Sequence, residues 1–303
     1  MQRTVSVVIP TFEPQTYLLE AVDSVLEQTL EVLEIFIIND ASEKEFNGLI
    51  EECALLSNKI SVINLSSNRG VSYCRNLGAQ HSNGEFVLFL DDDDLLHPNF
   101  LKNTMVIFDS ETTVDVVFGN LELVDTESKK LSFYYYQQLL RSNFIEWEPN
   151  AKDATFFIVQ CLIPHCFLFR KHVLEKIKFH ENIPRGQDSL FWIELAKSDF
   201  KVFEMDVLCG FYRLIDQNTR QRKGYDLKKL YYNTVIESGV LTKERELAIF
   251  NYQLMFFQVR NKRLPSFRSL QYIIECPVLF ARYVWFTCKI KGLAYYNYFL
   301  TKH

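Results

Sequence analysis

Phe86-Val-Leu-Phe-Leu-Asp-Asp-Asp-Asp94 joins an uninterrupted apolar run to four consecutive carboxylates, and this stretch decides the fold class. A strand that is apolar at every position is buried on both faces, as in parallel sheets covered by helices. In such sheets ligands bind beyond the carboxyl ends of the strands, where the four acids lie. The stretch therefore predicts an α/β protein with a polar ligand site at the end of a buried strand.

The first 120 residues repeat one unit, in which an apolar run is followed by a polar turn and a segment with helical spacing. The apolar runs span residues 4–9, 34–39, 60–65, 85–90 and 115–119. Strands separated by helices predict βαβ crossovers and a mostly parallel sheet. The turn Pro10-Thr-Phe-Glu13 after the first run lacks the G-x-G-x-x-G fingerprint, which disfavours a nicotinamide or flavin enzyme.

Polar side chains also follow the second and third runs. Asp40 follows the second run, and Asn64 to Asn68 lead from the third run into Arg69-Gly70. The carboxyl ends of parallel strands meet at one edge of a sheet, so these groups are expected to share a crevice with the four acids. This pattern predicts a site for a polar ligand.

The four adjacent carboxylates repel one another and require a counter-charge. In an extended segment Asp91 and Asp93 point to one side and Asp92 to the other, so Asp91 and Asp93 could serve one ligand. Carboxylate oxygens suit Mg²⁺ or Mn²⁺ held jointly with substrate phosphates. The alternative is a solvated turn, with Asp94 or a neighbour stabilising the N-terminus of a helix at Pro98.

Charge is distributed unevenly along the 303 residues, whose net charge of −5 argues against a nucleic-acid partner. Residues 258–303 hold eight Lys or Arg and one acid, a net +7, which leaves −12 for the remainder. Seven cysteines without a C-x-x-C pair predict reduced thiols. The sequence shows neither a signal peptide nor an apolar stretch long enough to cross a bilayer, so a cytoplasmic protein is expected.

Four sequence blocks together resemble glycosyltransferase family 2, the inverting enzymes of GT-A fold. The blocks start at Val5 (Val-Ser-Val-Val-Ile-Pro-Thr-Phe), Ile37 (Ile-Ile-Asn-Asp), Asn68 (Asn-Arg-Gly-Val-Ser-Tyr-Cys-Arg-Asn) and Phe89 (Phe-Leu-Asp-Asp-Asp-Asp). They occur in the family's order and spacing, and the resemblance extends to about residue 213. It implies a Rossmann-like GT-A sheet flanked by helices.

The resemblance also implies roles for the residues at the strand ends. Asp40 matches the acid that recognises the nucleotide base, and Arg75 the arginine that approaches the nucleotide. Asp91 and Asp93 match the family's D-x-D, with Asp93 on the metal and Asp91 near both the ribose and the metal. Without the family context, Asp40 could instead cap a helix and Arg75 form a surface ion pair. Four further residues are expected to bind the nucleotide, namely Pro10, Thr11, Glu13 and Asp92.

The second half of the resemblance concerns the chemistry of transfer. Asp188 matches the second acid of the family's Glu-Asp motif, the general base, while Gln187 replaces the first acid. The alternative is a structural role in which Asp188 caps a helix. Tyr212-Arg213 matches a Y-R segment, but Ile215 stands where the family often has His, so Arg213 could face the pyrophosphate or hold the loop by an ion pair. His165 lies where acceptor contacts are expected, although a core or rim histidine is the simpler interpretation.

The expected organisation is a GT-A catalytic domain over residues 1–220, with a nucleotide-sugar-binding half (1–120) and an acceptor-binding half (121–220). Residues 221–303 form a helical extension that is basic and aromatic. Basic residues interleaved with aromatics in 265–303 suit the headgroups of an anionic membrane, at the inner face of the plasma membrane. The alternatives are helices that pack on the catalytic domain or form a dimer contact, and more remotely a single-stranded nucleic-acid site.

The predicted function is an inverting glycosyltransferase that uses Mn²⁺ or Mg²⁺. It moves a sugar from a nucleotide-diphosphate donor, a UDP-sugar, to a hydroxyl of a glycan or lipid-linked acceptor, as in bacterial surface polysaccharide synthesis. The rival hypotheses are a nucleotidyltransferase that makes a nucleotide sugar and a non-catalytic protein that binds a sugar or cation. The sequence names neither the sugar, the acceptor, the linkage nor the oligomeric state.

Overall fold

The structure is a computed structural model that describes residues 3–134, 167–183 and 186–213, with the single positions 215, 235, 239, 241, 246, 247, 250 and 251. Its strands are β1 (Val5–Thr11), β2 (Glu34–Asn39), β3 (Ile60–Asn64), β4 (Phe86–Phe89), β5 (Leu95–Leu96), β6 (Val116–Val124), β7 (Lys130–Tyr134), β8 (Phe167–Arg170) and β9 (Val202–Arg213). Its helices are α1 (Tyr17–Leu26), the short η1 (Lys44–Phe46), α2 (Asn47–Leu55), α3 (Val71–His81), α4 (Phe100–Ser110), α7 (Lys171–Lys176) and α8 (Gln187–Lys197).

The described strands form one sheet in the order β3-β2-β1-β4-β8-β6-β9-β5, with β7 paired to β6. The first four strands in this order are parallel, as are β6 and β9. β8 runs antiparallel to both β4 and β6, and β5 and β7 are also antiparallel to their partners. The predicted α/β sheet is confirmed, with its purely parallel part confined to β1 to β4.

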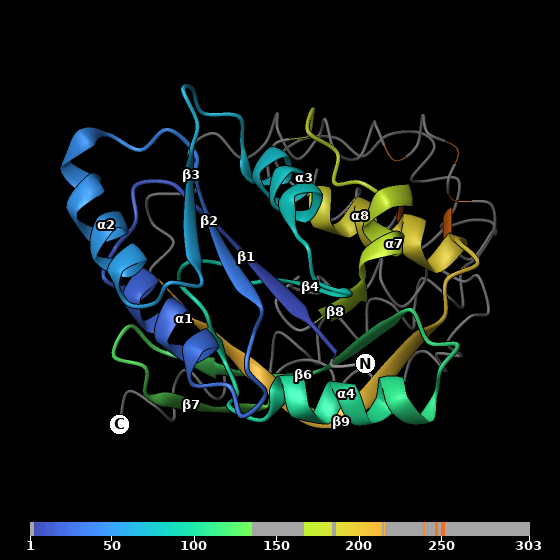
Figure 1. Cartoon of the computed structure of the whole chain (residues 1–303). Helices are drawn as coiled ribbons and strands as arrows, with labels where there is room; N and C mark the ends of the chain where they lie inside the picture. Colours follow the sequence, from blue (N-terminus) through green and yellow to red (C-terminus); the bar gives the residue numbers. More distant parts are fainter. Residues whose placement is uncertain are drawn as a thin grey trace.

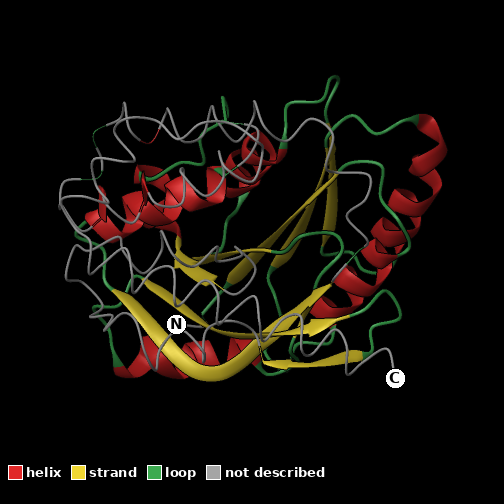
Figure 2. Cartoon of the chain, turned by 180° about the vertical axis from the view of Figure 1, so that it is seen from behind, coloured by secondary structure: helices red, strands yellow, loops and turns green. Residues whose placement is uncertain are grey.

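The core lies along the apolar strands that the sequence singled out. All seven residues of β1 and all four of β4 are buried, as expected of strands covered on both faces. In Figure 1, α3, α7 and α8 lie on one side of the sheet, and α1 and α4 on the other. Figure 2 shows from behind how the strands curl into a bowed sheet between these helices.

Much of the second half and of the extension falls outside the described residues. His165 and residues 265–303 belong to that part, so their predicted acceptor and membrane roles stay predictions. The described positions Val235, Leu241, Glu246 and Phe250 are all buried, and Glu246 pairs with Lys197 at the end of α8. Across the described residues, no helix combines the length and apolarity needed to cross a membrane.

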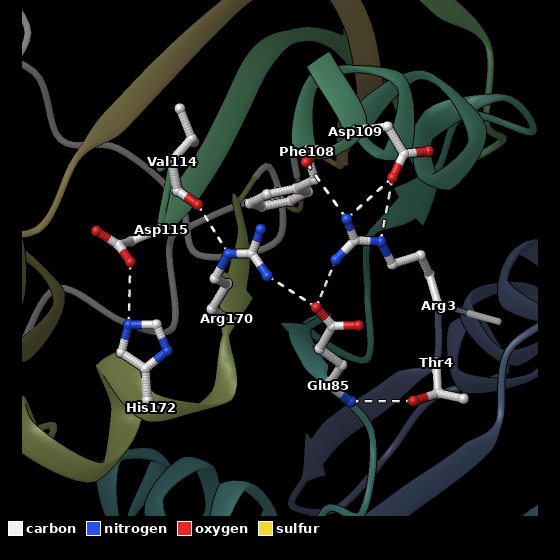
Figure 3. A network of polar contacts seen from close by, with 9 residues as sticks. All are labelled: Arg3, Thr4, Glu85, Phe108, Asp109, Val114, Asp115, Arg170 and His172. Carbon is white, nitrogen blue, oxygen red and sulfur yellow. Dashed lines mark hydrogen bonds and ion pairs between the residues drawn. The ribbon is translucent and has the colours of Figure 1, made fainter. Parts of the chain in front are cut away.

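An ion-pair network joins several elements at the amino edge of β4 (Figure 3). The Oε1 atom of Glu85 accepts from Nη1 of Arg3 at 2.5 Å and from Nη1 of Arg170 at 2.7 Å. The Arg170 Nε donates to the Val114 carbonyl at 2.8 Å, and Arg3 also pairs with Asp109 of α4. The network therefore ties the starts of β1, β4 and β6 to the end of β8.

We expect Glu85→Gln to lower the free energy of unfolding by about 1 kcal/mol, because two partly exposed ion pairs lose their shared charge. Urea unfolding followed by circular dichroism measures the change. Glu31→Gln is the matched control, since Glu31 is 79% exposed and pairs only with Lys59 among the described side chains. Equal unfolding midpoints for the two variants would show that the network adds nothing beyond a surface pair.

Candidate active site

A cavity of about 350 Å³ opens at the carboxyl ends of β1, β2, β4 and β9. Its walls come from segments far apart in the sequence, brought together by the sheet order. The lining residues are Pro10, Thr11, Phe12, Asp40, Val71, Cys74, Arg75, Asp91, Asp92, Asp93, Gln187, Asp188 and Tyr212. The structure thus gathers most of the predicted site residues in one place, at the predicted edge of the sheet.

The four consecutive acids form a turn and not the extended segment that the sequence suggested. β4 ends at Phe89, and the Asp94 N–H donates to the Asp91 carbonyl at 3.2 Å, which bends the chain between them. Asp91, Asp92 and Asp93 therefore all line the cavity, and no alternation of sides separates Asp92. The expected division into two faces was wrong because the backbone leaves the strand before the acids begin.

Asp91 is paired with the arginine of α3. Nη2 of Arg75 lies 2.6 Å from Oδ1 of Asp91, and the Arg75 side chain is only 4% exposed. The Nε and Nη1 atoms of Arg75 are buried and have no hydrogen-bond partner among the described residues. Buried donors without acceptors are costly, so this arginine presents unused hydrogen-bonding capacity beside the cavity. Arg75 therefore forms an ion pair, but the pair lies in the cavity and not on the surface as the alternative interpretation had it.

Asp92 is held by the end of β1. Its Oδ2 accepts from the Thr11 hydroxyl at 2.5 Å. Burial raises the pKa of Asp92 to about 6, and the negative charges of Asp91 and Asp94 add to this rise while the Thr11 bond opposes it. The buried Asp92 carboxyl is therefore protonated more readily than an ordinary aspartate.

Asp40 fixes the entry to α3. Its two carboxylate oxygens accept from the backbone N–H groups of Arg69 at 2.7 Å and Gly70 at 2.8 Å. Gly70 has a φ of +85°, a conformation that favours glycine, and α3 starts directly after it. The carboxylate thus holds the loop before α3 and also lines the cavity, but it is not the helix cap that the sequence allowed, because Gly70 occupies the N-cap position of α3.

Asp188 lies in the first turn of α8. The N-cap position belongs to Gly186, with a φ of +80°, so Asp188 is not the helix cap that the sequence allowed. Its Oδ1 accepts from the Ser189 N–H at 2.9 Å. Burial raises the pKa of Asp188 above its ordinary value, while the nearby Arg75 guanidinium acts in the opposite direction. A raised pKa makes the carboxylate a better proton acceptor.

Gln187 and Tyr212 also line the cavity, whereas two other predicted residues do not. The Gln187 Oε1 is buried and has no hydrogen-bond partner among the described residues. Glu13 is exposed, with a φ of +51°, and its backbone N–H donates to the Ser42 hydroxyl. Arg213 is buried behind the acidic turn and pairs with Glu20, so the ion-pair alternative describes its contacts.

Three lining residues were not predicted from the sequence. Phe12 follows Thr11 in the first strand-end block and is 46% exposed, so its ring is available to a planar group. Val71 and Cys74 precede Arg75 by four residues and one residue on α3. Side chains three and four apart share a helix face, so Val71 could have been found from Arg75 by helical spacing.

The acidic residues fit a divalent cation that is shared with a ligand. In the described part of the chain, no group of three or more His, Cys, Asp or Glu side chains could hold a metal ion. Mg²⁺ and Mn²⁺ sites in nucleotide enzymes commonly use one or two carboxylates and complete the shell with phosphates and water. Asp91 and Asp93 supply two such carboxylates beside the same cavity.

The family model and the relatives that match this chain agree on one protein family. A sequence model described as Glycosyl transferase family 2 matches residues 6–178, more than half of the chain. An uncharacterised glycosyltransferase of Rickettsia felis is 29% identical over 197 residues, which cover 64% of this chain and 31% of that protein. The minor teichoic acid biosynthesis protein GgaB of Bacillus subtilis is 25% identical over 287 residues, covering 89% and 28%. The chain spans less than a third of the length of these two relatives.

Two solved structures share the fold. TarS 1–349 of S. aureus in complex with UDP-GlcNAc has a TM-score of 0.60 at 20% identity, covering 85% of this chain and 74% of TarS 1–349. The mannosyltransferase PcManGT of Pyrobaculum calidifontis, in complex with GDP-Man and Mn²⁺, has a TM-score of 0.56 at 15% identity, covering 96% and 76%. These likenesses confirm the predicted GT-A fold.

Proposed function

Because the chain belongs to glycosyltransferase family 2, we propose that it transfers a sugar from a UDP-sugar to an acceptor hydroxyl with inversion of configuration. The observation that carries this proposal is the cavity itself. Three carboxylates of one turn, a buried arginine and a carboxylate of raised pKa on another element all line it. A cavity of about 350 Å³ falls within the usual range for small-molecule sites.

The donor is assigned to the half of the cavity formed by β1, β2 and β4. A carboxylate has four lone pairs, so Asp40 can accept from a ring N–H of uracil in addition to the N–H groups of Arg69 and Gly70. The half-exposed Phe12 ring offers a stacking surface to the base. The unpartnered Nε and Nη1 atoms of Arg75 suit phosphate oxygens. TarS, whose fold is shared, has been crystallised with UDP-GlcNAc, which supports a UDP-sugar.

Asp93 and Asp91 are the residues that would hold Mn²⁺ or Mg²⁺ together with the diphosphate. When bound, the ion stabilises negative charge on the departing nucleoside diphosphate. Asp92 keeps its bond to Thr11 and anchors the turn to the end of β1. The Mn²⁺ bound to PcManGT supports this choice of ion.

Asp188 is proposed as the general base. Its carboxylate takes the proton from the acceptor hydroxyl as the acceptor oxygen attacks the anomeric carbon of the donor. The bond to the diphosphate oxygen breaks in the same displacement, so the configuration inverts and no covalent sugar intermediate forms, unlike in a retaining glycosidase. Gln187 precedes the base without adding a second negative charge, and its buried Oε1 can accept from a substrate hydroxyl.

The acceptor is proposed to be a hydroxyl of a cell-surface glycan or of a lipid-linked saccharide. GgaB, which aligns with 89% of this chain, is named for minor teichoic acid biosynthesis. A lipid-linked acceptor agrees with the predicted contact between residues 265–303 and the inner face of the plasma membrane. Under this proposal the protein acts in the cytoplasm at that membrane.

The proposal is tested with a panel of UDP-sugars, Mn²⁺ and saccharide acceptors. We expect one donor to release UDP and extend an acceptor, with product analysis showing the inverted anomer. A nucleotidyltransferase would instead release pyrophosphate from UTP and a sugar phosphate, and a non-catalytic protein would bind donor without turnover. Either of these results contradicts the proposed transfer.

The pH dependence of transfer should report the raised pKa of Asp188. The base must be ionised, so kcat/KM should fall as pH drops through this pKa, at a pH above the value of about 3.9 of an ordinary aspartate. Mn²⁺-dependent UDP binding over the same pH range is the control, because Asp92 also titrates. A kcat/KM that stays flat down to pH 4, with binding intact, contradicts the role of Asp188.

A further inference from the structure

Arg213, the last residue of β9, is a buried cation that does not line the cavity. Its side chain is 0% exposed, and each of its nitrogens has an acceptor. Nε donates to the Asp93 carbonyl, Nη1 to the Ser128 hydroxyl and Nη2 to Oε2 of Glu20, each at 2.8 Å. The guanidinium thus joins the acidic turn to the loop between β6 and β7 and to α1.

The same residue holds the acidic turn a second time through its backbone. The Arg213 N–H donates to Oδ1 of the fully buried Asp94 at 2.8 Å. This bond lies next to the last pair of the antiparallel β5 and β9, in which Leu95 lies opposite Phe211. The acidic turn is therefore held at the Asp93 carbonyl and at the Asp94 side chain, while Asp93 lines the cavity.

The partners of Arg213 are themselves tied together. The Ser128 hydroxyl donates to Oε2 of Glu20 at 2.6 Å, and the Arg213 guanidinium carbon lies 4.2 Å from the ring centroid of Tyr17. Tyr17 and Glu20 both belong to the first turn of α1. Such a set of bonds to a planar guanidinium holds one orientation, which a flexible ammonium on a lysine stem cannot reproduce.

Two arginines therefore contact the acidic turn, one from the cavity and one from the protein interior. Arg75 binds the carboxylate of Asp91 within the cavity, and Arg213 binds the backbone of Asp93 and the carboxylate of Asp94 from the protein interior. Positive charge on both flanks lowers the repulsion among the four acids. Arg75 lines the cavity and has two nitrogens without an acceptor among the described residues, whereas each side-chain nitrogen of Arg213 has an acceptor and Arg213 does not line the cavity.

We propose that Arg213 is a positioning residue that sets the direction of the Asp93 carboxylate, and that Glu20 and Ser128 lock it in place. The inference rests on the proposed function, in which Asp93 binds a divalent cation with a nucleoside diphosphate. It assigns Arg213 no contact with substrate. Loosening Arg213 should therefore weaken binding of the cation and nucleotide more than it weakens the fold.

The test compares Arg213→Lys with Arg170→Lys in the full chain. Arg213 is buried and Arg170 is partly buried, and both form ion pairs, but Arg170 belongs to the network at the opposite edge of the sheet (Figure 3). Mn²⁺ binding with saturating UDP is measured by electron paramagnetic resonance of the free ion, and folding by thermal unfolding. We expect Arg213→Lys to raise the Kd for Mn²⁺ about tenfold, as loss of a residue that orients a metal ligand does.

Arg170→Lys should leave the Kd within about twofold, because distant sites act independently. Glu20→Gln weakens the ion pair of Arg213 without replacing the arginine, and it should raise the Kd for Mn²⁺ about threefold. This variant tests the positioning role if Arg213→Lys does not fold. A wild-type Kd in folded Arg213→Lys, or in Glu20→Gln when Arg213→Lys does not fold, overturns the positioning role, as does equal weakening in Arg170→Lys. Failure of the wild-type protein to bind Mn²⁺ with UDP would instead overturn the proposed function, and the positioning role with it.

Discussion

Asp188→Asn should reduce kcat for sugar transfer by about 10³-fold, because the amide cannot accept the proton of the attacking hydroxyl. Asparagine has nearly the shape of aspartate, so its Oδ1 can keep the bond from the Ser189 N–H. The affinity for the UDP-sugar should stay within about twofold, since only an interaction made in the transition state is removed. Single-turnover transfer and equilibrium donor binding measure the two effects separately.

The control for this variant lies on the same helix. Glu194→Gln also removes one carboxylate from α8, but Glu194 pairs with His180 at 2.8 Å and does not line the cavity. Transfer by Glu194→Gln should match the wild type. Wild-type turnover in Asp188→Asn would assign the proton to another group, and an equal loss in both variants would point to a general disturbance of α8.

Asp93→Ala is expected to weaken Mn²⁺-dependent UDP binding by about 100-fold or more. Removing a residue that only orients a metal ligand costs 10- to 100-fold in affinity, and removing the ligand itself should cost at least the upper figure. Thermal shift with UDP at several Mn²⁺ concentrations reports the change, because a ligand of the folded state raises its apparent stability. Chelation of Mn²⁺ should abolish the wild-type shift.

Asp109→Ala serves as the matched control for Asp93→Ala. Asp109 is an aspartate of α4 whose carboxylate pairs with Arg3 in the network of Figure 3. It lies outside the cavity, so its removal should leave the UDP shift unchanged. An Asp93→Ala protein that still shows the full Mn²⁺-dependent shift would remove Asp93 from the proposed cation site.

The strands could be predicted because burial on two faces leaves an unmistakable apolar run. The run at 34–39 matches β2 residue for residue, and the run at 86–89 falls inside the predicted 85–90. The strand-end residues that line the cavity could be placed together for the same reason, since parallel strands bring their carboxyl ends to one edge. Local pattern and sheet geometry were sufficient for these features.

The remaining features depend on contacts between residues far apart in the chain. Arg213 lies 193 positions from Glu20 and 85 from Ser128, and no local pattern relates three such residues. The turn at Asp91 to Asp94 likewise includes a distant contact, because the buried Asp94 carboxylate accepts from the Arg213 N–H. The antiparallel direction of β8 could not be predicted, because an apolar run does not indicate in which direction its strand crosses the sheet.

The two edges of the sheet have opposite electrostatic characters. The carboxyl edge gathers five aspartates around one cavity-lining arginine, an arrangement that opposes folding, whereas the amino edge satisfies its charges through Arg3, Glu85 and Arg170. The amino edge thus contributes ion pairs to the fold, whereas the carboxyl edge needs internal bonds, such as those of Asp40 and Arg213, to hold its acids in place. Under the proposed function, an exposed cavity-lining side chain such as Phe12 can change with little loss of fold, so that a new donor specificity can evolve on the same scaffold.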